Sequence, residues 1–176
     1  MKNLLYICLL CLSLIACKDE NSIQTFFVEH QEEPSYSLVD ISKTLIDFSD
    51  TDLTKDEREA YNALDKLHVL MYKATDSTQD AYTKELKQIQ KVFKNPDYSE
   101  LMQFSSDGMK FKISSIGEEN TVDEVLVLAS SNTMGFAAIR VLGDDMSPEK
   151  IAALISKMKD ANVDDNKLKG IMDFLK

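Results

Sequence analysis

Thiols, imidazoles and carboxylates are the groups through which this chain could do chemistry, and the thiols are the most informative. Cys8 and Cys11 lie in an apolar run, residues 4–15, that follows the positive charge of Lys2. A run of about a dozen residues is shorter than the roughly 20 that span a bilayer as a helix, and it has the length of a secretory signal segment. If that segment is removed, Cys17 is the only thiol left, so it has no partner for an intrachain disulfide.

The three residues in front of Cys17 indicate what this thiol does. They read Leu-Ile-Ala, and Leu-Ile-Ala-Cys closely resembles the bacterial lipobox. The resemblance implies that the Cys17 sulfur receives a diacylglycerol, that the chain is cut before Cys17, and that the new amine is acylated. An ordinary signal peptide followed by a chance cysteine is the alternative. We expect residues 1–16 to be removed and the chain to be attached to a membrane through Cys17.

The residues behind Cys17 carry a second signal. Lys18, Asp19 and Glu20 resemble the export signal of Bacteroidota lipoproteins, in which an acidic stretch follows the lipidated cysteine. This resemblance implies an outer-membrane lipoprotein that faces the cell surface. A lipoprotein on the periplasmic face, with these residues as the start of a solvated tether, is the alternative.

Metal and nucleophile patterns are weak in the rest of the sequence. The two histidines lie far apart: His30 in a polar, acidic segment expected to be a tether, and His68 in an expected strand, where a hydrogen-bonded structural role is favoured. No Gly-x-Ser-x-Gly turn or glycine-rich phosphate loop is present. Asp160, Asn162, Asp164 and Asn166 start like a calcium loop, but Asp165 stands where glycine is required and Ile171 where a bidentate glutamate is required. We therefore expect no metal and no cofactor.

The charge balance limits the partners. With 20 basic and 30 acidic residues the formal net charge is −10, which opposes non-specific binding to nucleic acid. The many acids leave a carboxylate-based hydrolase open as an alternative function, although no spacing singles out a catalytic pair.

One basic surface stands out against this acidity. Lys84, Lys87, Lys91 and Lys94 form a stripe opposite the apolar face of an expected helix, residues 77–94. The stripe could contact anionic headgroups or an acidic partner, and a solvated helix face is the simpler alternative.

The helices and strands expected along the chain indicate an α+β fold, with one mainly antiparallel sheet of about five strands packed with helices. We expect a single domain over residues 37–176 behind a tether, residues 17–36, whose apolar island at 26–28 could fold back onto the domain. Helices are expected over residues 38–48 and 77–94. Another is expected to begin at Thr54, whose capping box includes Glu57. Two more are expected at the end of the chain, one capped by Ser147 and one with an apolar stripe of Leu168, Ile171, Met172 and Leu175. Strands are expected at 66–73, 98–104, 109–116, 123–130 and 134–142.

Two of these strands are apolar on both sides. Residues 125–129 and 136–139 lack the alternation of a strand with one wet face, so both faces must be covered. Either the N-terminal helices or a partner supplies the second cover. By contrast, Lys110 and Lys112 alternate with Phe111 and Ile113, which indicates one wet face on that strand.

The order and spacing of several segments resemble the family called domain of unknown function 4252, which consists of small exported bacterial lipoproteins. The matching segments lie within residues 38–158 and include "VDISKTLIDF", "LDKLHVLMY", "FKNPDYSELMQF", "DGMKFKI", "VDEVLVLAS" and "VLGDDMSPEKIAALI". The family brings no known reaction and no catalytic residues. Its members are thought often to be encoded near genes for extracytoplasmic-function sigma factors, which implies a role in envelope stress or signalling.

These expectations combine into one functional hypothesis. The chain is expected to be a lipid-anchored, non-enzymatic envelope protein that binds an unidentified envelope partner or takes part in signalling. A carboxylate hydrolase and a purely structural surface lipoprotein are the alternatives.

Overall fold

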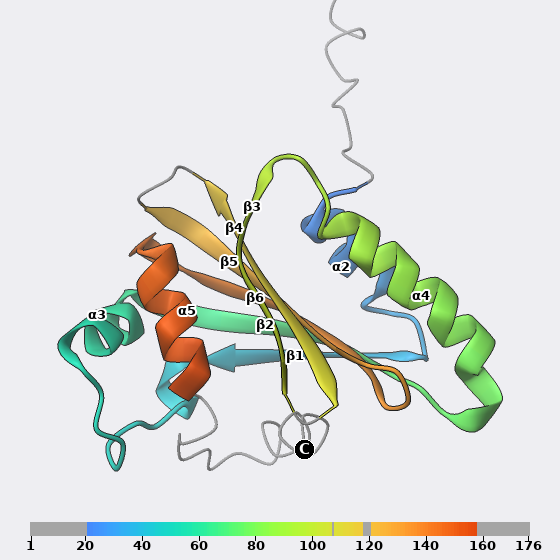
Figure 1. Cartoon of the computed structure of the whole chain (residues 1–176), viewed down its shortest axis with the longest axis horizontal. Coiled ribbons are helices and arrows are strands. Elements are labelled where there is room, and N and C mark those ends of the chain that lie inside the picture. Colours follow the sequence, from blue (N-terminus) through green and yellow to red (C-terminus); the bar gives the residue numbers. More distant parts are fainter. Residues whose placement is uncertain (1–20, 107, 118–120, 158–176) are drawn as a thin grey trace, which may run out of the picture.

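The computed structural model describes residues 21–106, 108–117 and 121–157. The described part is a six-stranded antiparallel sheet in the order β1-β2-β6-β5-β4-β3, with helices packed on both faces (Figure 1). Its elements are α2 Ile23–His30, β1 Tyr36–Ser42, the 3-10 helix η1 Lys43–Leu45, α3 Lys55–Ala63, β2 Leu64–Lys73, η2 Asp76–Thr78, α4 Gln79–Val92, β3 Tyr98–Ser106, β4 Met109–Gly117, β5 Val122–Ser131, β6 Gly135–Met146 and α5 Pro148–Lys157. The predicted α+β class is confirmed, with one strand more than expected.

The additional strand replaces the helix expected over 38–48, and that prediction was wrong. Residues 36–42 pair with β2 in unbroken register, from Tyr36 opposite Tyr72 to Ser42 opposite Lys66. The helical spacing that suggested a helix does not form one buried stripe, because Ile41 is buried while Leu38 is exposed. Pairing with a strand more than twenty residues away outweighs the local pattern, since strand propensity depends on tertiary context.

One face of the sheet is covered by α2 and α4. Ile23, Phe26 and Phe27 of α2 are buried with Ile89 and Val92 of α4 over the even-numbered side chains of the central strands. Phe26 and Phe27 thus fold back onto the domain, as one sequence alternative anticipated, while Val28 stays exposed. The packing of α2 leaves little of the expected tether between residue 17 and the domain.

Aromatic rings and one hydroxyl hold α4 in place on this face. Phe136, fully buried, stacks on Tyr72 at 5.7 Å between ring centroids and on Tyr82 at 6.3 Å. The Tyr82 hydroxyl donates to the carbonyl oxygens of Ser131 and Gly135, which ties α4 to the β5–β6 turn. Burial raises the pKa of Tyr82 to about 12, so this donor stays protonated.

The opposite face is covered by α3 and α5 with aliphatic side chains. Ile151 and Leu154 of α5 and Ala60 of α3 pack over odd-numbered side chains such as Val125 and Val141. The predicted capping box begins α3: the Thr54 hydroxyl accepts from the Glu57 N–H, and the Glu57 carboxylate accepts from the Thr54 N–H. Both faces of the central strands are therefore covered from within the chain, as their apolar composition required.

Several predicted features lie outside the described residues. These are the signal segment, Cys17 with Lys18, Asp19 and Glu20, the calcium-like sequence from Asp160, and the last helix with its stripe of Leu168, Ile171, Met172 and Leu175. Within the described residues no helix is long and apolar enough to cross a membrane.

Candidate functional site

A groove between α4 and the β3–β4–β5 part of the sheet is the best candidate for a binding site. Its volume is about 250 Å³ and it opens to solvent. Nine residues line it, three of them lysines and none of them acidic: Gln90, Phe93, Lys94, Gln103, Lys110, Phe111, Lys112, Leu128 and Ser130. The composition is unusual in a chain with a net charge of −10.

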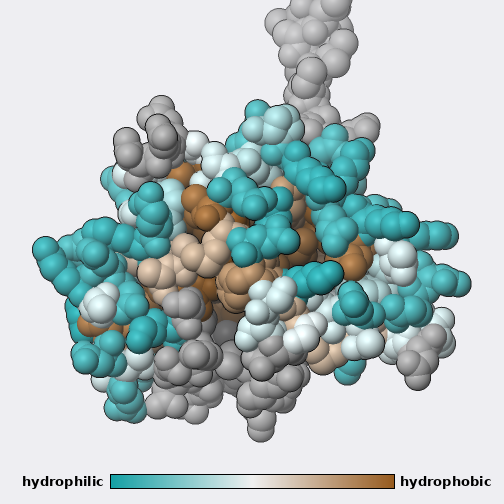
Figure 2. All heavy atoms as spheres, viewed as in Figure 1, coloured by the Kyte–Doolittle hydropathy of each residue, from teal (hydrophilic) through white to brown (hydrophobic). Residues whose placement is uncertain are grey.

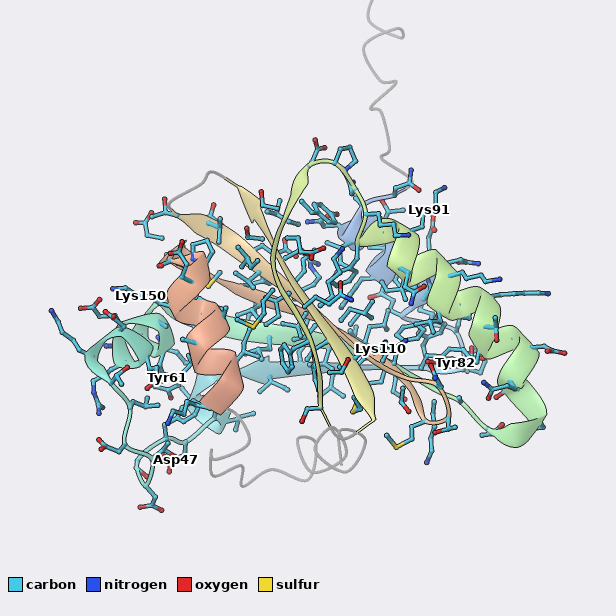
Figure 3. All side chains as sticks on the ribbon, viewed as in Figure 1. Asp47, Tyr61, Tyr82, Lys91, Lys110 and Lys150 are labelled. Atoms are coloured by element: carbon cyan, nitrogen blue, oxygen red, sulfur yellow. The ribbon has the colours of Figure 1, made fainter. Side chains whose placement is uncertain are left out.

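Strand alternation directs the side chains of two of these lysines to the groove. Lys110 and Lys112 lie two residues apart on β4, so their side chains project from the same face of the sheet, and both line the groove beside α4 (Lys110 is labelled in Figure 3). Across the ladder, Lys112 lies opposite Gln103 of β3 and Leu128 of β5, and Lys110 lies opposite Ser130. The cross-strand neighbours of the lysines thus form the polar walls and part of the apolar floor of the groove.

The third lysine comes from the end of α4. Val92 and Phe93 are buried against the sheet, which fixes the last turn of the helix beside β3 and β4. Lys94 follows with an exposed side chain, and its N–H donates to the carbonyl oxygen of Lys91 at 3.0 Å. Cations are favourable at a helix C-terminus because the last carbonyl groups carry partial negative charge.

Most of these lysines lack a carboxylate partner. Lys112 contacts Glu100, with 2.9 Å between its Nζ and a carboxylate oxygen. Among the residues that the structure describes, no ion pair is formed by Lys94 or Lys110, nor by the other members of the predicted stripe, Lys84, Lys87 and Lys91. Two groove ammonium groups are therefore free to meet an anion.

The predicted stripe and the groove overlap at one residue only. All four stripe lysines are exposed, three of them on α4 and Lys94 two residues beyond its end, but only Lys94 lines the groove. Sequence reasoning missed Lys110 and Lys112 as site residues, although it did identify the wet face of their strand. No local signal could join them to Lys94, because the packing of α4 on the sheet brings them together.

The arrangement suits anion binding. Lysine ammonium groups, two amides and the Ser130 hydroxyl supply hydrogen-bond donors for oxyanions, and Phe93 and Leu128 supply apolar contact. Among the described residues, three carboxyl groups have a clearly shifted pKa, Asp47, Glu57 and Glu59, and each pKa is lowered, mainly by hydrogen bonds to the carboxylate. A general acid in a carboxylate hydrolase requires a raised pKa.

Both histidines are engaged in structural contacts. His68 Nδ1 lies 2.5 Å from an Asp40 carboxylate oxygen, across the β1–β2 ladder. His30, expected in the tether, is instead buried at the end of α2, where its Nδ1 lies 2.8 Å from the Phe26 carbonyl oxygen. Within residues 21–106, 108–117 and 121–157, no group of three or more potential metal ligands comes together.

Two further polar contacts near α2 were not anticipated. Tyr36 donates to Glu85 at 2.7 Å, and burial together with this carboxylate raises the pKa of Tyr36. Arg140 of β6 holds Glu124 of β5 through two nitrogens, at 2.5 and 3.2 Å, and lies 5.5 Å from the centroid of the Phe27 ring. The pair fixes α2 over the sheet beside the groove-bearing strands.

The start of the described chain lies next to the end of α4. The Asn21 carbonyl oxygen accepts from Asn95 Nδ2 at 3.3 Å, and the Ile23 N–H donates to the Tyr98 hydroxyl at 2.8 Å. Asn95 directly follows Lys94, so the segment that leads back to Cys17 joins the domain beside the lysine-bearing end of α4.

The fold and the groove define a small α+β domain with an open antiparallel sheet and a cationic groove on one of its faces. The chain belongs to the family described as Domain of unknown function (DUF4252), whose model matches residues 27–154. The match begins inside α2 and ends inside α5, which confirms the family resemblance of the sequence and extends it to α2. No curated protein and no solved structure matches the chain.

Proposed function

We propose that this protein is a lipid-anchored, non-enzymatic module of the cell envelope that binds an anionic group through the groove between α4 and β3–β5. The observation that carries the proposal is the meeting of Lys94, Lys110 and Lys112 in a groove whose lining holds no acidic side chain. In a protein of net charge −10 such a surface favours an anionic ligand over a neutral one.

The anchor in this proposal is Cys17. The apolar run before it and the Leu-Ile-Ala-Cys sequence support lipidation, and Lys18, Asp19 and Glu20 support an outer-membrane location that faces the cell surface, with the periplasmic face as the alternative. Two or more acyl chains hold a protein firmly, whereas a single chain binds only marginally.

Two measurements test the anchor and its location. The intact mass of the protein from membranes should exceed that of a chain starting at residue 17 by a diacylglycerol and an acyl chain, and Cys17→Ala should abolish this increase. Protease treatment of intact cells should degrade the protein. Complete protection until lysis would contradict the surface location and favour the periplasmic face.

Photo-crosslinking in cells tests the groove. A photoreactive residue replaces Gln90, which lines the groove, and in a control chain it replaces Asn62, which is exposed on α3. The proposal predicts an adduct with an envelope component from position 90 that is lost in Lys94→Gln/Lys110→Gln/Lys112→Gln. Equal adducts from both positions, or a yield that ignores the three lysines, would contradict a role for the groove.

A further inference from the structure

We propose that the anionic ligand of the groove is the phosphate-bearing headgroup of the membrane that holds the anchor, so that the domain lies on this membrane with the C-terminal end of α4 against it. This inference rests on the proposed lipidation of Cys17. It assigns the domain one orientation, with α3 and α5 away from the membrane.

The chain between the anchor and the domain is short. Asn21 and Ile23 are held by hydrogen bonds to Asn95 and Tyr98. Three residues lie between Cys17 and Asn21, which makes four Cα-to-Cα steps, and an extended chain spans at most about 3.6 Å per step, or about 14 Å in all. A domain of this size has a radius of gyration of about 14 Å. The connection is therefore too short for the domain to turn freely above the membrane.

The chain from Cys17 joins the domain beside two exposed lysines. Asn95 lies in the connection between α4 and β3, and Tyr98 is the first residue of β3. Figure 1 shows α2 beginning beside the C-terminal end of α4. Lys91, labelled near this end in Figure 3, and Lys94 are both exposed here. A lipid at Cys17 thus places the membrane surface close to these two ammonium groups and to the groove that includes Lys94.

The charges at this end of the domain favour contact with an anionic membrane surface. Two acids at this end form ion pairs: Glu100 pairs with Lys112, and Glu124 pairs with Arg140. A third acid, Asp97, is exposed. Lys91, Lys94 and Lys110 form no ion pair within the described residues. Charges act across about 8 Å at physiological ionic strength, so lysines this close to anionic headgroups are attracted to them. Acidic surfaces elsewhere on the domain are repelled, which favours the same orientation.

The shape and chemistry of the groove fit a headgroup. Ammonium, amide and hydroxyl donors line it, and each can donate to a phosphate oxygen. The side chains of Phe93 and Leu128 offer apolar contact to the carbon atoms that adjoin the phosphate. In Figure 2 hydrophobic surface lies in the middle of the view, with polar side chains among it and on both sides of it.

The test measures which end of the anchored protein meets the membrane. Because Cys17 carries lipid in the processed protein, a cysteine introduced at Gln90 or at Asn62 is the only free thiol and can carry a fluorophore. The processed lipoprotein is placed in phosphatidylcholine vesicles that contain phosphatidylglycerol and a headgroup quencher. We expect several-fold stronger quenching at position 90 than at position 62, and a loss of this difference in Lys94→Gln/Lys110→Gln/Lys112→Gln.

The outcomes separate this inference from the function on which it rests. Equal quenching at the two positions in vesicle-bound protein would overturn the orientation and leave the anchor intact. A protein without the acyl mass increase that fails to float with vesicles would overturn the anchor, and the inference with it. A fluorescence response of position 90 to inorganic phosphate in the absence of vesicles, equal to the vesicle response, would assign the groove to a free anion and overturn the headgroup assignment.

Discussion

Lysines at the two ends of the molecule have different surroundings. At the α3–α5 end, Lys150 lies 3.1 Å from an Asp56 carboxylate oxygen and also contacts Glu59, and these hydrogen bonds raise the pKa of Lys150 and lower that of Glu59. At the α4 end, Lys84, Lys87, Lys91 and Lys94 form no ion pair within the described residues. One residue type thus joins two helices at one end and is available to an external anion at the other.

The helices on the two faces of the sheet also differ in the side chains that pack them against it. Aromatic rings make up much of the layer under α2 and α4, whereas the layer under α3 and α5 is mostly aliphatic, with one aromatic pair, Tyr61 of α3 against Phe48. Aromatic side chains bury a large area and restrict the orientation of what they contact. The rings of Tyr72 and Phe136, which stack on Tyr82, therefore restrict the orientation of α4, the helix that carries three of the stripe lysines.

The largest effect is expected from removing the ring at the centre of the aromatic layer. Phe136→Ala should lower the free energy of unfolding by about 3–5 kcal/mol, because it deletes a fully buried side chain and its stacking on Tyr72 and Tyr82. Urea denaturation measures the loss. Phe104→Ala is the matched control, since Phe104 is 37% exposed and, among the described residues, stacks on one ring, that of Phe111. It should cost about 1 kcal/mol. Equal losses would contradict the central role of the aromatic layer.

A smaller loss is expected from breaking the ion pair under α2. Arg140→Met should cost about 2 kcal/mol, because it leaves the Glu124 carboxylate, 10% exposed, without its charged partner. Replacing both residues by methionine should recover part of the loss, since a paired charge can be exchanged for apolar packing. Urea denaturation of the single and double variants checks this. A single variant as stable as the wild type would show that the pair does not fix α2.

Acid should weaken the α3–α5 end. The pKa values of Glu57 and Glu59 lie below their ordinary value of 4.5, so each carboxylate contributes stability that is present above pH 4.5 and is lost as the pH falls through the folded-state value. The urea midpoint should therefore drop as the pH falls from neutral to below 4.5 and these groups take up protons. In Glu57→Gln/Glu59→Gln the drop should be smaller, because glutamine at position 57 preserves the capping box without titrating. An unchanged drop would assign the acid sensitivity to other carboxyls.

The smallest effect on stability is expected from the groove lysines. Lys94→Gln/Lys110→Gln/Lys112→Gln should leave the urea midpoint close to that of the wild type, because Lys112 alone of the three has a carboxylate partner among the described residues. Lys150→Gln should lower the midpoint more, since it removes the contacts to Asp56 and Glu59. The reverse order would mean that the groove lysines serve the fold.

Much of this molecule could be predicted from its sequence where the deciding interactions are local. The capping box of Thr54 and Glu57, the helix that carries the lysine stripe and the alternation of Lys110 with Phe111 are set within a few residues. The strand at residues 36–42 could not be predicted in this way, because its pairing with β2 overrides a helical spacing.

The groove could not be predicted for the same reason. Lys94 belongs to a helix end, and Lys110 and Lys112 belong to a strand that begins about fifteen residues later. Only the packing of Val92 and Phe93 on the sheet brings the three together. The Glu124–Arg140 pair likewise depends on the register of β5 and β6.

A charge-matched comparison on membranes tests the central claim most directly. The processed lipoprotein with a fluorophore at position 90 is placed in phosphatidylglycerol-containing vesicles, and headgroup quenching is compared between Lys94→Gln/Lys110→Gln/Lys112→Gln and Lys43→Gln/Lys55→Gln/Lys150→Gln. Each variant loses three positive charges, the second set from the α3–α5 end and η1. The account predicts that quenching falls in the first variant and stays at the wild-type level in the second. Equal quenching in both variants would contradict it.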